Sequence, residues 1–375
     1  MRLNPVLEGL ATYPFVRLDE AKDAAVARGI DVIDFGKGEP REETAPFIRA
    51  ALVAALDPLS TYPAAVGLPE LRAAIAAWTE RRFGASLDPD REVVPTLGSK
   101  EAIFHLAQIA GGEAVAVTTP GYPVAERGAR FAGLDVVEVP LDPARGFLPD
   151  LDALAPAVLD RLAILWLNYP NNPTGATIDL ATLAHAAALA RRHDFVLACD
   201  EAYSELWFAG DAPVSALQLD DRTNVVALNT LSKRSSMPGY RSGFIAGDAR
   251  LIAAIKRYRP NVGVAPQVFV QRAAVAAWGD EAHVEAVRAR YARKRELLLP
   301  ALEAAGFALA GGDATFFLWV RTPGGEDDEA CALRLLERGI ACAPGSYFGA
   351  GGAGHLRFAL VPAPEDCARA AERLA

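Results

Sequence analysis

The chain has 375 residues, more than the roughly 250–300 at which one hydrophobic core stops growing, so we expect two packed lobes. Its composition, 51% hydrophobic and 23% charged, is that of a globular protein and excludes a disordered chain. The net charge of −9 argues against a nucleic-acid binder, which needs a concentrated basic face. An acidic substrate would therefore have to be bound by individual arginines.

The cysteines and histidines form no recognisable metal motif. The five histidines show no HxxxH or HExxH spacing, and no CxxC pair is formed by Cys199, Cys331, Cys342 and Cys367. The first five residues contain no apolar signal core, and alanine-rich runs such as 73–78 are too short to span a bilayer. We expect a cytoplasmic protein with reduced cysteines, no metal and no membrane segment.

The N-terminal segment, residues 1–46, is too short to fold alone, and we assign it to the smaller of the two lobes. Two helices follow, each with proline in its first turn. One begins at Pro46 and the other at Pro69, and Gly84 ends the second.

Between residues 93 and 247, short apolar runs alternate with helical segments, which predicts a mainly parallel sheet covered by helices. Such α/β sheets bind ligands at the carboxyl ends of their strands. We assign this sheet to a large domain of residues 47–265. The seven expected strands are 93–96, 114–118, 136–139, 162–167, 195–199, 225–229 and 243–246.

After Pro266 the pattern changes, and we expect a smaller α+β domain of residues 266–375. It should contain a long helix, a strand, a second helix, another strand and a final helix. The first four of these are expected at 281–304, 316–320, 327–338 and 355–360.

The stretch TLSKRSSMPGYRSG, residues 230–243, directly follows an apolar strand and places Lys233 among hydroxyls and an arginine. A lysine becomes a Schiff-base nucleophile when burial and nearby cations lower its pKa. Arg241, with the hydroxyls of Thr230 and Ser232, could then hold a phosphate. The alternative is a surface loop with an ordinary lysine.

Two further polar stretches follow predicted strands. Residues 168–175, NYPNNPTG, must form a loop at the carboxyl edge of the sheet, and could be no more than a turn capped by its asparagines. Asp200, in DEAY, ends a strand, where a buried carboxylate needs a cationic partner such as a protonated pyridine nitrogen. A helix N-cap is the alternative for Asp200.

In this order the motifs resemble those of the fold-type I, class I/II pyridoxal-phosphate aminotransferases over nearly the whole chain. The resemblance implies pyridoxal 5'-phosphate as cofactor, with Lys233 as both the Schiff-base lysine and the catalytic base. It also implies a homodimer in which Tyr62 of TYPAAVG reaches the phosphate of the neighbouring subunit. The remaining implied cofactor residues are Asp200 at the pyridine nitrogen, Tyr203 and Asn172 at the ring hydroxyl, Tyr122 stacked on the ring, and Arg241, Thr230, Ser232, Gly98, Ser99 and Lys100 at the phosphate.

For the substrate, Arg357 stands at the position of the family's α-carboxylate arginine, and Gly38 and Asn172 are expected to contact the substrate as well. An exposed strand residue is the alternative for Arg357. Lys37, Arg41 and Arg234 are spare cations that could meet a distal acidic group. We expect only structural roles for Glu39, Trp166, Phe348 and the histidines.

The implied reaction moves an amino group from an amino acid to an oxo acid, most simply 2-oxoglutarate. Residues 13–18, 232–244 and 314–319 are similar to those of the bacterial N-succinyldiaminopimelate aminotransferases of lysine biosynthesis. We therefore expect N-succinyl-LL-diaminopimelate as the amino donor. Aspartate, alanine or acetylornithine as donor, or a β-lyase reaction, are the alternatives; a regulator is disfavoured because no residues remain for a DNA-binding domain.

Overall fold

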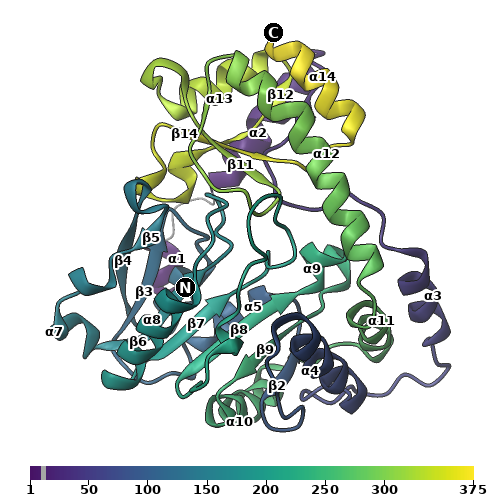
Figure 1. Cartoon of the computed structure of the whole chain (residues 1–375), viewed down its shortest axis with the longest axis vertical. Coiled ribbons are helices and arrows are strands. Elements are labelled where there is room, and N and C mark those ends of the chain that lie inside the picture. The colour runs from purple at the N-terminus through teal and green to yellow at the C-terminus, as the bar shows by residue number, and fades with distance from the viewer. Residues whose placement is uncertain (10–13) are drawn as a thin grey trace.

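In the computed structural model, which describes residues 1–9 and 14–375, an eight-stranded sheet crosses the larger of two lobes (Figure 1). The central strands β8, β7, β6, β3 and β4 are parallel neighbours, β9 runs antiparallel to β2 and β8, and β5 is antiparallel to β4. In spatial order the strands are β2 (Val93–Thr96), β9 (Gly243–Gly247), β8 (Val225–Thr230), β7 (Val196–Asp200), β6 (Leu162–Asn168), β3 (Ala114–Thr119), β4 (Asp135–Asp142) and β5 (Leu148–Pro149).

The seven predicted strands are confirmed, with ends that differ by up to three residues, and the sheet is mainly parallel as expected. The eighth strand, β5, was not predicted, because two residues are too short to show an alternating pattern.

Helices cover both faces of this sheet because neighbouring strand residues point to opposite sides. Ile164 and Val226 pack in a cluster with α5 (Ser99–Leu106), α6 (Val124–Phe131) and α10 (Ala249–Tyr258). Leu165 and Ala227 pack in a second cluster with α4 (Pro69–Phe83), α8 (Leu180–Arg192) and α11 (Val268–Trp278). The short helices α1 (Pro5–Gly9), α3 (Pro46–Ala54), α7 (Pro156–Leu159) and α9 (Leu231–Arg234) complete the α-helices of this part of the chain.

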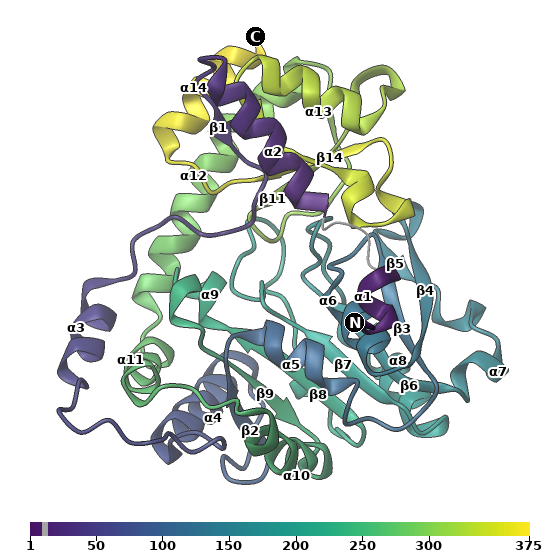
Figure 2. The same cartoon turned by 180° about the vertical axis from the view of Figure 1, so that it is seen from behind.

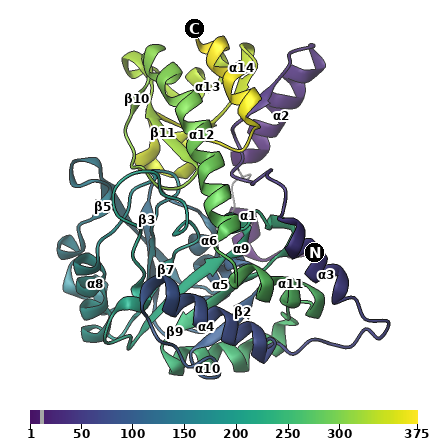
Figure 3. The ribbon, with the colours of Figure 1, turned by 45° about the vertical axis from the view of Figure 1, so that its right-hand side comes forward.

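The smaller lobe has an antiparallel sheet in the order β10 (Ala308–Leu309), β11 (Phe317–Arg321), β14 (His355–Ala359) and β13 (Ala343–Pro344). Its helices are α12 (Ala282–Ala304), α13 (Asp328–Glu337) and α14 (Pro364–Leu374), so the predicted elements of this region are confirmed. Figures 1 and 3 show α12 running from beside α9 and α11 in the larger lobe up into the smaller one.

The N-terminal segment contacts the smaller lobe. The strand β1 (Ile33–Asp34) pairs in parallel with β12 (Ile340–Ala341), and α2 (Pro14–Ala27) lies beside α13 (Figure 2). At the other boundary, α11 packs on α3 and α4 of the larger lobe. The domain ranges 1–46, 47–265 and 266–375 stay a prediction.

Short 3₁₀ turns lie in the connections, at Pro143–Arg145, Leu151–Ala153, Ala216–Gln218, Pro238–Tyr240, Arg259–Val262, Pro323–Gly325, Gly345–Phe348 and Ala350–Gly352. Within the described residues no helix combines the length and the apolar character needed to cross a membrane. In the same part of the chain, no group of three or more His, Cys, Asp or Glu side chains is arranged to hold a metal ion.

Candidate active site

A cavity of about 500 Å³ opens where strands β6, β7 and β8 end, facing the smaller lobe. Residues from segments far apart in the sequence line it together. Of the residues predicted for the site, the lining contains Gly38, Ser99, Lys100, Tyr122, Asn172, Asp200, Tyr203, Thr230, Ser232, Lys233, Arg241 and Arg357.

Lys233 extends into this cavity from α9, a single helical turn that follows β8. The Thr230 side chain caps α9 by accepting a hydrogen bond from the backbone N–H of Ser232 (3.1 Å). The Lys233 amine donates to the carbonyl oxygen of Gly38 (2.6 Å). Burial, and then the nearby cations Arg357 and Arg241, lower the pKa of Lys233 to about 8. A neutral amine, the form that attacks a carbonyl carbon, is therefore accessible near neutral pH.

One end of the cavity suits a phosphate group. The Arg241 guanidinium lies there, donating to the carbonyl oxygens of Leu97 (2.9 Å) and Pro238 (2.9 Å), with the Ser232 hydroxyl 3.4 Å away. Ser99 opens α5, so the positive end of that helix dipole faces the same region. Gly98 is outside the lining, but it makes room for the arginine: a Cβ there would lie 2.5 Å from Arg241 Nη2.

Asp200, which also lines the cavity, ends β7 with its carboxylate buried. Burial raises the pKa of Asp200 to about 6, against the hydrogen bond that it accepts from the backbone N–H of Ala202 (3.3 Å). A buried carboxylate in this state favours a cationic partner, and a protonated pyridine nitrogen would supply one. Burial also raises the pKa of the nearby Tyr203, which keeps its hydroxyl a hydrogen-bond donor.

Arg357 is 3% exposed, so the alternative of an exposed strand residue is wrong. Its guanidinium donates to Asn172 Oδ1 (2.9 Å) and to the carbonyl oxygen of Gly36 (2.7 Å). It lies 4.3 Å and 4.5 Å from the ring centroids of Phe317 and Phe348. An arginine held between rings at a cavity wall can bind a carboxylate with two parallel hydrogen bonds.

Tyr62 is the predicted site residue that lies away from the cavity. It is fully exposed, in the connection between α3 and α4.

Each of the three spare cations has a protein partner in the folded chain. Lys37 lines the cavity but pairs with Asp19 (2.6 Å), and Arg41 pairs with Asp34 (3.3 Å). Arg234 is wholly buried outside the lining. Burial makes Arg234 unavailable for a distal acidic group, whereas that role stays a prediction for Lys37 and Arg41, whose ion pairs are half-exposed.

Sequence reasoning missed several lining residues. Glu39 and Phe348, for which only structural roles were expected, both line the cavity, whereas Trp166 is buried in the cluster that packs against α5 and α6. Glu39 directly follows the Gly38 motif, so its position was a usable signal. The other unpredicted lining residues are Asn168, Ala202 and Pro238, which lie within the motifs already quoted, and Phe15 and Phe317, which lie outside those three motifs.

One family of known proteins matches nearly the whole chain. The family model for aminotransferase class I and II matches residues 30–374. An LL-diaminopimelate aminotransferase from Aquifex aeolicus is 38% identical, over 98% of this chain and 97% of its own.

Two solved structures have closely similar folds. A probable N-succinyldiaminopimelate aminotransferase from Thermus thermophilus superposes with a TM-score of 0.87 at 36% identity, over 96% of this chain and 98% of its own. An aspartate aminotransferase from the same organism superposes with a TM-score of 0.91 at 32% identity, over 100% of this chain and 99% of its own.

The chain therefore belongs to the class I and II aminotransferases, and it is a pyridoxal-phosphate-dependent enzyme of fold type I. The cavity fits that cofactor: its donor set offers an amine, an arginine beside the start of α5, and a buried carboxylate with a raised pKa.

Proposed function

We propose that Lys233 is the reacting amine of a transamination in this cavity, and that Arg357 binds the α-carboxylate of the amino donor. The bound cofactor would supply an electron-accepting ring, which Asp200 keeps protonated. Lys233, with a pKa of about 8, would then move the proton removed from the substrate Cα. The observation that carries the proposal is the convergence of Lys233, Asp200, Arg241 and Arg357 on one cavity.

The amino donor proposed is LL-diaminopimelate, with 2-oxoglutarate as the acceptor, in the synthesis of lysine. Support comes from the relative at 38% identity, whose name states this donor. The distal end of LL-diaminopimelate carries both an ammonium and a carboxylate. Glu39 lines the cavity with an exposed side chain and forms no ion pair with another described residue, so it can accept the ammonium.

N-succinyl-LL-diaminopimelate, the donor predicted from the sequence, is the second candidate, supported by the likeness to the Thermus thermophilus protein. In that substrate the distal ammonium is replaced by a neutral amide, and the succinyl group adds a carboxylate. The cations that could meet this carboxylate, Lys37 and Arg41, are already paired with Asp19 and Asp34. Because these pairs would have to open to meet the succinyl carboxylate, whereas Glu39 has no ion pair to break among the described residues, we favour the unmodified donor.

A panel of amino donors with 2-oxoglutarate tests both ideas in one assay. The expected order of kcat/KM is LL-diaminopimelate first, N-succinyl-LL-diaminopimelate second, and then aspartate, alanine and N-acetylornithine. A higher kcat/KM for aspartate than for either diaminopimelate would reject the proposed donor. Release of pyruvate and ammonia from cystathionine would instead identify a β-lyase.

The proposal includes a homodimer in which the partner's Tyr62 reaches the phosphate end of the cavity. Exposed apolar side chains cluster on α3 and the segment after it: Phe47, Val53, Leu56, Leu59 and Tyr62. A surface of this kind is typical of a protein interface. We also propose a cytoplasmic location, in keeping with four free and buried cysteines.

A further inference from the structure

Arg234, the residue after Lys233, points away from the cavity into the protein. Its side chain is wholly buried, and the guanidinium carbon lies 5.5 Å and 5.0 Å from the ring centroids of Trp78 and Trp278. An arginine with no exposed surface costs free energy unless its donors are satisfied. Its partners therefore indicate what it holds in place.

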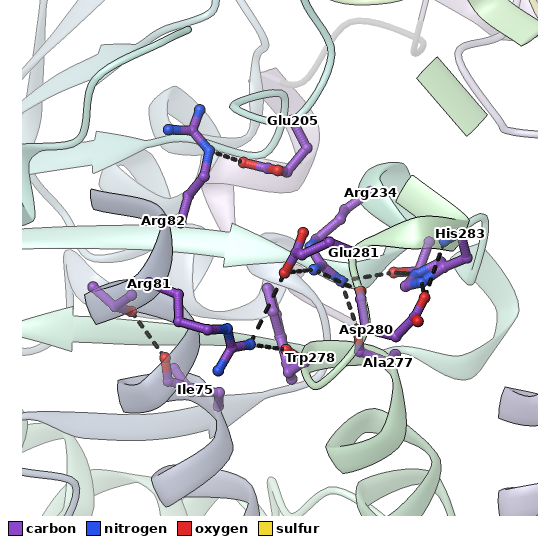
Figure 4. Close-up of polar contacts among 12 residues, drawn as sticks. Ile75, Arg81, Arg82, Glu205, Arg234, Ala277, Trp278, Asp280, Glu281 and His283 are labelled. Atoms are coloured by element: carbon purple, nitrogen blue, oxygen red, sulfur yellow. Dashed lines mark hydrogen bonds and ion pairs between the residues drawn. The ribbon is translucent and has the colours of Figure 1, made fainter. Parts of the chain in front are cut away.

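These partners lie where α11 ends and α12 begins (Figure 4). Arg234 donates to the carbonyl oxygens of Ala277 (2.7 Å) and Asp280 (3.2 Å), and it forms an ion pair with Glu281 (2.7 Å). Ala277 is in the last turn of α11, where carbonyl groups lack helical partners and the dipole favours a cation. Glu281 is the N-cap residue of α12. One guanidinium thus joins two helix ends to α9.

A second connection runs parallel to the first. Ser235, the C-cap residue of α9, hydrogen-bonds through its hydroxyl to His283 Nε2 (2.8 Å). The other ring nitrogen of His283 bonds to Asp280 (2.6 Å). Both residues that follow Lys233 are therefore attached to the start of α12, the helix that runs between the two lobes.

We propose that Arg234 is a positioning residue, which clamps α9 to the junction of α11 and α12 and so keeps the Lys233 amine aimed into the cavity. The N-terminal side of α9 is already fixed by β8 and the Thr230 cap. A helix of one turn has few contacts of its own, so its C-terminal side depends on what Arg234 and Ser235 hold. This inference rests on Lys233 being the reacting amine.

The test compares variants of the full-length holoenzyme. In Arg234→Met, kcat should fall about tenfold or more while KM changes by less than about threefold, because a displacement of about 1 Å can cost on the order of 10²-fold in rate. Arg234→Lys should recover part of kcat, since lysine keeps the positive charge but lacks the several fixed N–H donors of the guanidinium. Glu281→Gln should lower kcat by about threefold, since the two carbonyl contacts remain.

Arg81→Met is the matched control. From α4, Arg81 donates to the carbonyl oxygen of Trp278 (2.8 Å) and lies 4.0 Å from Glu281. It contacts the same helix end, but within the described part of the chain it has no hydrogen bond or ion pair to α9. Its loss should change kcat by less than about twofold.

A second readout uses cofactor-free protein and needs no turnover. The pH dependence of Lys233 acylation, followed by mass spectrometry, should have a midpoint near the pKa of about 8. In Arg234→Met the midpoint should move up towards the ordinary lysine value, because a displaced amine regains water. Arg81→Met should leave it unchanged.

The variants distinguish failure of the proposed role of Arg234 from failure of the assignment of Lys233. If Arg234→Met and Glu281→Gln both match Arg81→Met in kcat and in the acylation midpoint, the positioning role is wrong. If Arg234→Met does not fold, the pair Glu281→Gln and Arg81→Met decides in the same way. If Lys233→Ala keeps its activity, the assignment of the reacting amine itself fails, whatever the Arg234 variants do.

Discussion

At the scale of single residues, the site depends on groups held in states that water would not favour. Lys233 has a lowered pKa and Asp200 a raised one, and burial is the largest cause of both shifts. Burying either charge costs free energy in the cofactor-free protein. With the proposed cofactor bound, its cationic ring would offset the cost of burying the Asp200 carboxylate, so the site would give up stability in the empty protein for tighter binding.

Replacing Asp200 tests how much the burial of its carboxylate costs the cofactor-free protein in stability. Its pKa rises from an ordinary 3.8 to about 6 on folding, so the unfolding free energy of the cofactor-free protein should fall as pH rises through this window, because the folded state holds the proton longer. Above the window, Asp200→Asn should raise that free energy by about 2–3 kcal/mol, since each pKa unit is worth ~1.4 kcal/mol. Urea unfolding at several pH values measures both effects.

The same variant should lose at least about 100-fold in kcat, because a neutral amide cannot keep the ring protonated. If Asp200→Asn were less stable than the wild type above pH 6 and still active, both its burial cost and its proposed role would be wrong.

Glu39 is predicted to set the choice of donor. Glu39→Gln removes the charge with little change of shape, and the ratio of kcat/KM for LL-diaminopimelate to that for N-succinyl-LL-diaminopimelate should fall by about threefold to tenfold, as expected for one partly exposed ion pair. Rates measured with both donors on both proteins give the ratio. An unchanged ratio would mean that Glu39 does not contact the distal group.

At the scale of elements, the sequence predicted best where structure is locally encoded. Strands such as β6 and β7 are apolar up to their last residues, Asn168 and Asp200, because both faces are covered, and their positions were correct. The pairing of β1 with β12 joins residues about 300 positions apart, and two-residue strands carry no pattern.

In the candidate site, too, residues in local motifs could be predicted, whereas contacts between distant segments could not. Lys233, Asp200 and Arg241 lie in motifs that follow strands, so their convergence at one sheet edge could be anticipated. The rings around Arg357 could not, because Phe317 and Phe348 come from different segments of the smaller lobe and meet only in the folded chain. The burial of Arg234 likewise depends on Trp78 and Trp278, which no local motif connects to it.

The loop before α5 gives a prediction at this scale. Gly98 has φ +70°, and an added Cβ would meet Arg241 Nη2 at 2.5 Å. Gly98→Ala should displace Arg241 and raise the dissociation constant of the cofactor about tenfold or more, which corresponds to ~1.4 kcal/mol. Fluorescence titration of the cofactor-free protein measures it.

Gly84→Ala provides the control, because Gly84 has φ +67° and no heavy atom within 4 Å of the added Cβ. Gly84→Ala should lose about 1–2 kcal/mol of stability from its left-handed backbone, and Gly98→Ala more, because its ψ of −177° lies in a region almost confined to glycine. Only Gly98→Ala should bind the cofactor more weakly; equal affinities would refute a steric role for this glycine.

At the scale of the whole molecule, the single chain leaves the predicted site residue Tyr62 fully exposed and away from the cavity. We expect the protein to have the mass of a dimer in light scattering. Tyr62→Phe should raise the dissociation constant of the cofactor about tenfold, because a hydrogen bond to a charged group contributes ~1.5–3 kcal/mol.

Mixed dimers test directly whether Tyr62 of one subunit completes the cavity of the other. A Lys233→Ala chain paired with a Tyr62→Phe chain should contain one cavity with both an intact Lys233 and the partner's Tyr62. That cavity should bind the cofactor as tightly as the wild type. A monomeric protein, or mixed dimers without any tight site, would contradict the shared site.

The hydrogen bond from Lys233 to the carbonyl oxygen of Gly38 links positions 195 residues apart. In the cofactor-free protein the amine thus occupies an acceptor that a substrate ammonium could use. If Lys233 holds the cofactor, as proposed, the same nitrogen would be engaged there and the carbonyl oxygen of Gly38 would become available. With Lys233 as the proposed cofactor lysine, we expect amino acids to bind the cofactor-free protein more weakly than the holoenzyme, because its amine competes for the carbonyl oxygen of Gly38.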